Sequence, residues 1–262
     1  MSVDDGRLAL PIVDDDQFRE RFGRGRAVPH SVSTWNATDS AEAYHRNMSR
    51  PATRQLLADI GYDDRSIEYR YNNHGFRSEM DFHQATHRHG TMFVGCSFTE
   101  GVALRPEETW CHIMGRRFSG PIFNLGQGGT GIDSQCRLLR AWASYLLPQR
   151  VFTLGAFGYR REIVHDDGSI EPIGPWSRNV GDMLVRFYGN ESSKTLHTNL
   201  CLDAMKQTCN QHGIELWAAS DDLRNGLGWN DPCDRGRDLF HVGRASHARI
   251  GESGMEMWVR LA

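Results

Sequence analysis

Short apolar runs alternate with longer amphipathic stretches from about residue 90 to the C-terminus. Each run is bounded by turn-forming residues, which is typical of a buried strand. The runs are Thr91–Gly95, Pro121–Leu125, Arg150–Leu154 and Ile214–Ala219. Strands that alternate with helices favour a parallel sheet covered on both faces. The pattern therefore predicts an α/β fold, a three-layer sandwich with a mostly parallel sheet of about five strands.

The stretches between these runs have the apolar spacing of helices. Ile132–Leu147 places its large apolar residues on one face, as an amphipathic helix does. Ser192–His212 is the longest stretch, and the Gly213 that follows it is a frequent residue after a helix end. Pro106–Phe118 carries a further apolar face and predicts a helix between the first two strands.

Residues 1–85 show a different pattern, in which short helical patches precede one strand. The patches are Asp16–Phe22, Ser40–Met48 and Pro51–Ile60, and the alternating strand is Ile67–Tyr71. Proline near the start of a helix and glycine after its end are typical boundaries, and Pro51 and Gly61 occupy these places. We therefore expect an N-terminal extension that packs on a main domain of residues 86–262.

Residues 163–191 show no strong period and are rich in Gly, Pro and Asp. A long irregular stretch inside a compact domain is often a lid or a binding loop. A surface insertion without a role has the same composition, so both interpretations stay open.

Composition and charge narrow the class of protein. The 262 residues are 39% hydrophobic and 24% charged, which excludes a disordered chain. The formal net charge of −3 argues against a nucleic-acid binder that works by bulk electrostatics. The six cysteines form no C-x-x-C pair, which favours thiols in a reducing compartment over disulfides or a zinc site. Because neither a signal peptide nor a membrane-spanning run is visible, we expect a cytoplasmic protein.

Three segments carry the candidate chemistry. The loop GCSFTEG follows the first strand and presents Ser97. The loop NLGQGGTG follows the second strand, and its glycines let backbone N–H groups approach an anion or an oxyanion. The segment DLFH places Asp238 three residues before His241, a spacing at which a carboxylate can orient an imidazole. In α/β sheets, ligands bind at the carboxyl ends of the strands, where such loops gather.

In this chain order, the three segments resemble the blocks of the SGNH, or GDSL-type, hydrolases over about residues 66–255. The resemblance implies a flavodoxin-like topology and a serine hydrolase that needs no cofactor. It implies that Ser97 is the nucleophile and that Asp238 and His241 complete a triad. It also implies an oxyanion hole made by the backbone N–H groups of Ser97 and Gly129. The upstream segment YNNHGFRS is similar to an N-x-x-G-F-R segment of some subgroups.

One block departs from the family's pattern. The third block usually reads G-x-N-D, and its Asn helps to hold the oxyanion, whereas Phe157 stands at that place here. Phe cannot donate a hydrogen bond, and the loss of one oxyanion donor typically costs about 10²–10³ in rate. We expect Tyr159 or Arg160, and then Asn124, to make this contact or to bind the substrate. Ordinary surface or salt-bridge roles for Tyr159 and Arg160 stay open.

The activity implied by the resemblance is hydrolysis of an ester by acyl transfer to water. The partner would be a small-molecule or glycan ester, which makes a carbohydrate O-deacetylase or a short-chain esterase the favoured activity, without a metal. The alternative is an SGNH-like module that binds a glycan or a protein, for example in a larger assembly. Phe157 is the main support for this alternative.

Two further motifs allow other functions. The run Gly126–Gly131 also fits the G-x-G-x-x-G of dinucleotide sites, but no acidic residue ends the next strand, where such a site needs one. His83, His87 and His89 lie close together, and the first two would share a helix face as metal ligands can. No acidic or Cys partner follows at a recognisable spacing, so a polar approach to the first strand is favoured. His247 is interpreted as structural.

Overall fold

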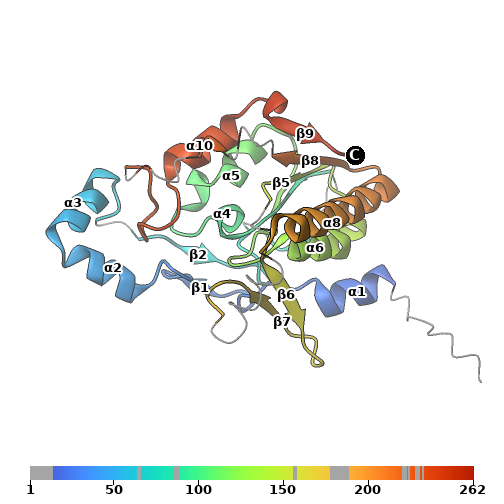
Figure 1. The fold of residues 1–262 in the computed structure, drawn as a ribbon, viewed down its shortest axis with the longest axis horizontal. Coiled ribbons are helices and arrows are strands. Elements are labelled where there is room, and N and C mark those ends of the chain that lie inside the picture. The colour runs from blue at the N-terminus through green and yellow to red at the C-terminus, as the bar shows by residue number, and fades with distance from the viewer. Residues whose placement is uncertain are drawn as a thin grey trace, which may run out of the picture.

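A five-stranded sheet organises the chain in the computed structural model (Figure 1). In sheet order, its strands are β4 (Ile122–Asn124), β3 (Thr91–Val94), β5 (Arg150–Thr153), β8 (Glu215–Ala219) and β9 (Trp258–Arg260). The first four strands run parallel, and β9 pairs antiparallel with β8. The four apolar runs are therefore confirmed as neighbouring strands of one mostly parallel sheet.

The structure describes most of the chain. The described residues are 14–63, 66–78, 80–84, 89–155, 158–177, 189–219, 223, 225–227, 231 and 233–262. Within this part of the chain, no helix is both long enough and apolar enough to cross a membrane. All six cysteines are free thiols.

Helices cover both faces of the sheet (Figure 1). One pair is α6 (Ile132–Leu146) with α8 (Glu191–His212), and the other is α5 (Trp110–Gly115) with α10 (Arg244–Glu252). Successive side chains of a strand point to opposite faces of its sheet. Met92 and Val94 accordingly join the apolar core beneath α6, whereas Phe93 joins the core beneath α5. Both faces are thus buried, which gives the three layers of an α/β sandwich.

The helix expected over Pro106–Phe118 is divided in the structure. A short 3-10 helix, η2 (Pro106–Glu108), precedes α5, and Thr109 between them has an extended backbone. The Thr109 hydroxyl accepts the backbone N–H of His112 and so caps α5. The expected ranges of α6 and α8 agree with the structure to within one residue. Further 3-10 helices are η1 (Phe82–Gln84) and η3 (Met255–Met257).

The N-terminal residues form short elements beside the sheet. They are α1 (Asp15–Phe22), β1 (Val32–Ser33), α2 (Ala41–Met48), α3 (Pro51–Asp59) and β2 (Tyr69–Arg70). Helix α1 packs on α6, and β1 pairs antiparallel with β2. Leu57, Tyr62 and Tyr69 pack in one buried cluster with Leu104, which lies beyond residue 85. This cluster joins the two parts of the chain.

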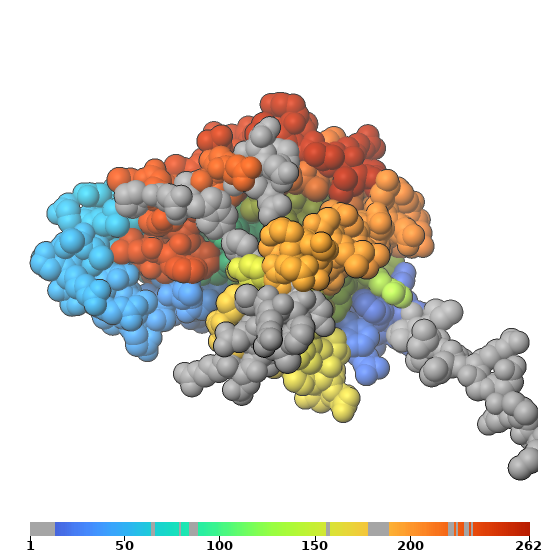
Figure 2. Space-filling model, viewed as in Figure 1, coloured from blue at the N-terminus to red at the C-terminus, as the bar shows by residue number. Residues whose placement is uncertain are grey.

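Segments far apart in the sequence meet at one end of the molecule. Figure 2 shows α2 and α3 in light blue at this end, with C-terminal residues in orange-red against them. Arg244 Nη2 donates to the carbonyl oxygen of Ile60 at 2.6 Å across this contact. The N-terminal elements therefore touch the segment that carries Asp238 and His241.

The expectation of an irregular stretch from residue 163 is wrong over its first part. The chain forms an antiparallel hairpin of β6 (Arg161–Val164) and β7 (Ile170–Ile173). Gly168 lies in the turn with φ 80°, a left-handed conformation that glycine adopts readily. Asp-Gly is a known hairpin signal, and Asp167-Gly168 supplies it. Residues 178–188 lie outside the described residues.

Candidate active site

Ser97 lies at the carboxyl end of β3, where the chain enters the short helix α4 (Ser97–Glu100). Gly95 permits this turn, because a Cβ atom there would lie 1.9 Å from Thr99 Oγ1. Gly101 ends α4 in the left-handed conformation, with φ 79°. Ser97 is 8% exposed, so its hydroxyl is nearly enclosed at the sheet edge where α/β folds bind ligands.

His241 connects Ser97 and Asp238. Its Nε2 atom lies 2.8 Å from Ser97 Oγ, and its Nδ1 atom lies 2.7 Å from Asp238 Oδ2. Asp238 Oδ1 accepts the backbone N–H groups of Phe240 and His241, both at 3.0 Å, so the loop itself orients the carboxylate. With a neutral ring, Nδ1–H donates to Asp238 and Nε2 accepts the Ser97 hydroxyl, as a general base requires. The structure thus brings together the three residues that the sequence motifs suggested.

Thr38 is a fourth member of this cluster, and no sequence motif indicated it. Its Oγ1 atom donates to Asp238 Oδ2 at 2.5 Å and lies 3.3 Å from His241 Nδ1. Burial by itself would raise the pKa of Asp238. The hydrogen bonds from His241 and Thr38, together with the charge of His241, outweigh burial and lower this pKa below its ordinary value. Asp238 is therefore held as a carboxylate.

A buried ion pair fixes the turn that carries Thr38. Asp39 is fully buried and accepts Arg237 Nε and Nη2 at 2.9 and 2.8 Å. The Tyr69 hydroxyl donates to the same carboxylate at 2.5 Å. Backbone hydrogen bonds in both directions join Asn36 and Asp39 across the turn. Because the polar groups of this pair are well matched, the turn is anchored against the segment that contains Asp238.

The Gly-rich loop after β4 lies beside the nucleophile. A Cβ atom on Gly128 would lie 3.8 Å from the Cβ of Ser97. Gly129 has φ 78°, which a residue with a side chain rarely adopts. Among the described residues, neither the backbone N–H of Ser97 nor that of Gly129 donates to a protein acceptor. Both groups are therefore free to donate to an oxyanion.

Glu100 anchors this loop, and sequence reasoning missed it. The Glu100 carboxylate is 8% exposed, and its Oε2 atom accepts the backbone N–H of Gly128 at 2.6 Å. Its Oε1 atom accepts Asn36 Nδ2 at 2.8 Å and the Tyr71 hydroxyl at 3.2 Å. The side chain thus ties the N-terminal turn, the nucleophile helix and the Gly-rich loop together. In the sequence, only its position within the block GCSFTEG links Glu100 to the site.

The residues expected to replace the third-block Asn have different surroundings. Asn124 donates from Nδ2 to the Thr99 carbonyl at 2.8 Å and accepts the Gly126 N–H at 2.9 Å, so its amide holds two loops together. The carbonyl oxygen of Arg160 lies against Gly131, because a Cβ atom on Gly131 would be 2.5 Å from it. Arg160 is therefore next to the Gly-rich loop. Tyr159 lies in the turn before β6, and Phe157 lies outside the described residues.

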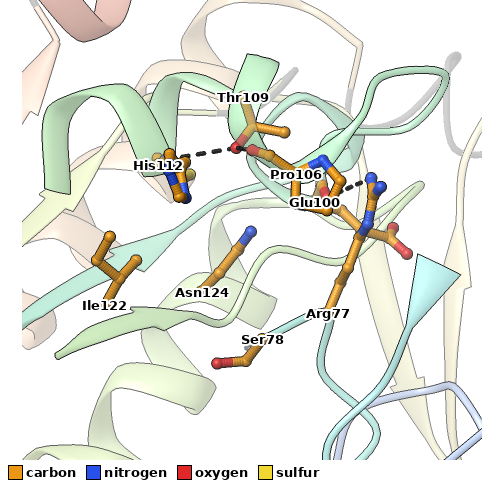
Figure 3. A pocket seen from close by; sticks show the side chains of 9 residues that line it. Arg77, Ser78, Glu100, Pro106, Thr109, His112, Ile122 and Asn124 are labelled. Atoms are coloured by element: carbon orange, nitrogen blue, oxygen red, sulfur yellow. Dashed lines mark hydrogen bonds between the residues drawn. The ribbon is translucent and has the colours of Figure 1, made fainter. Parts of the chain in front are cut away.

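Arg77, in the N-x-x-G-F-R segment, stabilises the C-terminal end of α4 and the turn that follows it. Arg77 donates from its guanidinium to the carbonyl oxygens of Gly101 and Leu104 at the end of this helix. A cavity of about 40 Å³ lies beside it, between α4, α5 and β4 (Figure 3). Ser97 is not among the described residues that line this cavity. Its size suits ordered water rather than a substrate.

Two other histidines, His247 and His83, have structural contacts. His247 is buried, and its Nδ1 atom accepts the backbone N–H of Trp110 at 3.0 Å, which agrees with a structural role. Burial lowers the pKa of His247 to about 3, so its ring is neutral. His83 Nδ1 lies 2.9 Å from Asn73 Nδ2, and His87 lies outside the described residues.

Comparison with known proteins identifies no family for this chain. A scan against protein-family models finds no match to this sequence, and a search of curated proteins finds none either. The function of this chain is therefore inferred from the geometry of its site.

Proposed function

We propose that this protein is a serine hydrolase that cleaves an ester through Ser97, His241 and Asp238. One observation carries the proposal: the three side chains form a continuous hydrogen-bonded chain, with contacts of 2.8 and 2.7 Å. Serine is a weak nucleophile unless a base removes its proton, and this chain supplies that base together with the group that orients it. Ser97 is 144 residues away from His241 in the sequence, so local structure does not account for the contact between the nucleophile and the Asp238–His241 loop.

The first half of the reaction forms an acyl-enzyme. His241 Nε2 takes the Ser97 proton while Oγ attacks the ester carbonyl, and Asp238 stabilises the imidazolium that results. The N–H groups of Ser97 and Gly129 stabilise the oxyanion of the tetrahedral intermediate. When the intermediate collapses, the ester C–O bond breaks, and His241 returns the proton to the departing alcohol.

Water completes the cycle. His241 removes a proton from a water molecule, whose oxygen attacks the acyl-enzyme and forms a second tetrahedral intermediate. Its collapse breaks the bond to Ser97 Oγ, which regains a proton from His241 as the carboxylic acid leaves. The triad ends in its starting protonation state, and no metal or organic cofactor enters these steps.

The sheet supports the same proposal. Numbered by their order along the chain, its strands follow the order 2-1-3-4-5, as in flavodoxin-like sheets, except that the last strand is antiparallel. Ser97 and the Gly-rich loop follow the two strands at one side of this sheet, both at their carboxyl ends. The order of the strands supports the resemblance to SGNH hydrolases. A short-chain esterase or a carbohydrate O-deacetylase is the activity that this resemblance implies.

Labelling with a fluorophosphonate tests the nucleophile directly. This probe reacts with a serine that a neighbouring base activates, whatever the natural substrate is. We expect the native protein to be labelled and to hydrolyse members of a panel of p-nitrophenyl esters of rising chain length. Ser97→Ala should abolish labelling and lower hydrolysis by about 10³-fold or more. Ser169→Ala, on the exposed β6–β7 turn, is the matched control and should change neither.

Absence of both labelling and hydrolysis in the folded native protein would contradict this function. The non-catalytic binding module would then be the better interpretation. Circular dichroism of each variant distinguishes loss of chemistry from loss of fold.

A further inference from the structure

Trp176 is half exposed although it lies against the Gly-rich loop. The residue follows β7, and 50% of its surface is exposed. A Cβ atom on Gly129 would lie 3.3 Å from Trp176 Cζ2, so the edge of the indole contacts this loop. The preceding residue, Gly128, lies against Ser97. The indole therefore contacts Gly129, and the adjacent Gly128 lies against the nucleophile Ser97.

The fold holds this ring in place. Gly174 makes room for it, because a Cβ atom there would lie between 2.3 and 2.5 Å from three atoms of the indole. Arg160 Cζ lies 5.0 Å from the ring centroid, within the range of a cation–π contact. Pro172 and Ile173, at the end of β7, are buried and anchor the chain before the ring. A ligand that stacks on a fixed ring costs less side-chain ordering than one that binds a mobile ring.

A second cavity, much larger than the one beside Arg77, lies at the same edge of the sheet. Its volume is about 470 Å³, within the size range of small-ligand sites. Ile132, which directly follows the Gly-rich loop, lines one side of it. The wall formed by α8 is mostly polar and consists of Glu191, Lys194, Thr195, Thr198, Asn199 and Leu202. Gly158 also lines the cavity, and Arg160, two residues further along the chain, lies over the indole, so residues 158–160 connect the cavity with Trp176, which is not itself among the described lining residues.

Resting on the esterase function proposed above, we propose that Trp176 and the polar wall of α8 form a sugar subsite. The ring of a sugar that carries the ester stacks on the indole, and its hydroxyl groups bind the side chains of α8. The C–H bonds on one face of a sugar ring suit the electron-rich face of an aromatic ring. Its hydroxyl groups need hydrogen-bond partners once water is displaced, and the threonine and asparagine side chains provide them.

A long acyl chain fits this subsite poorly. Buried beside it, the hydroxyl and amide groups of Thr195, Thr198 and Asn199 would lose water without gaining a partner, which costs binding free energy at each group. The charged ammonium group of Lys194 would also lie beside the apolar acyl chain, where it is poorly solvated. A polar ring with an apolar face satisfies both the indole and the α8 wall.

Binding to an inactive variant tests the subsite without turnover. The protein carries Ser97→Ala, the probe is a methyl glucoside with one O-acetyl group, and calorimetry measures the Kd. In this background, Trp176→Ala should weaken binding about tenfold, the scale of one lost stacking contact. Trp176→Phe keeps an aromatic face and should recover most of the affinity. Val259→Ala, which removes an equally exposed apolar side chain on β9, should leave the Kd unchanged.

A second probe sharpens the result. Phenyl acetate offers an aromatic ring without hydroxyl groups, and Thr198→Val removes one hydroxyl from the α8 wall. We expect Thr198→Val to weaken binding of the glucoside a few-fold and to leave phenyl acetate unaffected. No binding of the glucoside, equal affinity in Trp176→Ala, or an effect confined to phenyl acetate would each overturn the sugar subsite. Fluorophosphonate labelling of the native protein does not depend on this outcome, so failure of the subsite and failure of the esterase function are distinguishable.

Discussion

Replacing Thr38 with Val would remove one hydrogen bond from the triad and nearly preserve the shape of the side chain. Thr38 Oγ1 donates to Asp238 Oδ2, the atom that also accepts His241 Nδ1–H. Asp238 accepts two more hydrogen bonds, from the backbone N–H groups of Phe240 and His241. Valine cannot donate, so a buried carboxylate would keep three of its four donors.

The burial of this carboxylate determines the size of the effect. The Asp238 side chain is 0% exposed, so water does not readily replace the lost donor. A hydrogen bond to a charged group typically contributes about 1.5–3 kcal/mol, and we expect the free energy of unfolding to fall by about 1–2 kcal/mol near neutral pH. A carboxylate that is held less firmly orients His241 less well. We therefore expect kcat to fall about tenfold, or about 1.4 kcal/mol, with KM little changed.

The pH dependence has a defined sign. The pKa of Asp238 is lowered in the folded protein, so its stabilising effect exists above the unfolded pKa of about 3.9 and is lost as the pH falls through the folded value. The stability difference between native protein and variant should therefore shrink in acid.

Two assays check these outcomes. Ester hydrolysis at neutral pH gives kcat and KM, and urea unfolding at neutral and acidic pH gives the stability. Thr38→Ser restores the donor and should recover most of the rate. Thr53→Val is the matched control, because the Thr53 hydroxyl donates to the Asn47 carbonyl, outside the site. Unchanged rate and stability in Thr38→Val would refute the reasoning, as would an equal loss of rate in Thr53→Val.

Three further substitutions probe other parts of the site and its support. Glu100→Gln places an amide donor where three donors now meet, so we expect kcat to fall about tenfold as Gly128 loses its anchor; an unchanged kcat would argue against this anchoring. Asp39→Asn leaves the charge of Arg237 buried without an anion, and urea unfolding should show a loss of about 3–5 kcal/mol, whereas a loss below about 1 kcal/mol would contradict the buried pair. The pKa of His247 is lowered to about 3, so its stabilising effect exists above the unfolded pKa of about 6.5 and declines as the pH falls toward 3. His247→Gln should therefore lose less stability than the native protein between neutral pH and pH 4, and equal losses would count against a neutral buried ring.

Much of the fold could be predicted because its determinants are local. The four parallel strands are short apolar runs between turn residues, and the sequence pattern located each of them. The pairing of Asp238 with His241 is also local, since one loop orients both residues. The hairpin β6–β7 was missed because the Asp-Gly turn signal lay within a stretch that has no clear alternation.

The sequence by itself determined the order of the strands along the chain, their apolar faces and the types of residue at the carboxyl ends. These features depend on side-chain periodicity and on neighbours within a few residues, which the chain displays directly. Only the tertiary structure decided that Thr38 contacts Asp238, 200 residues away, and that Glu100 anchors Gly128. Single polar residues of this kind have no period, and in sequence they resemble ordinary turn or surface residues. Their partners are chosen when the apolar layers pack, because a buried donor or carboxylate must then find a partner inside the protein.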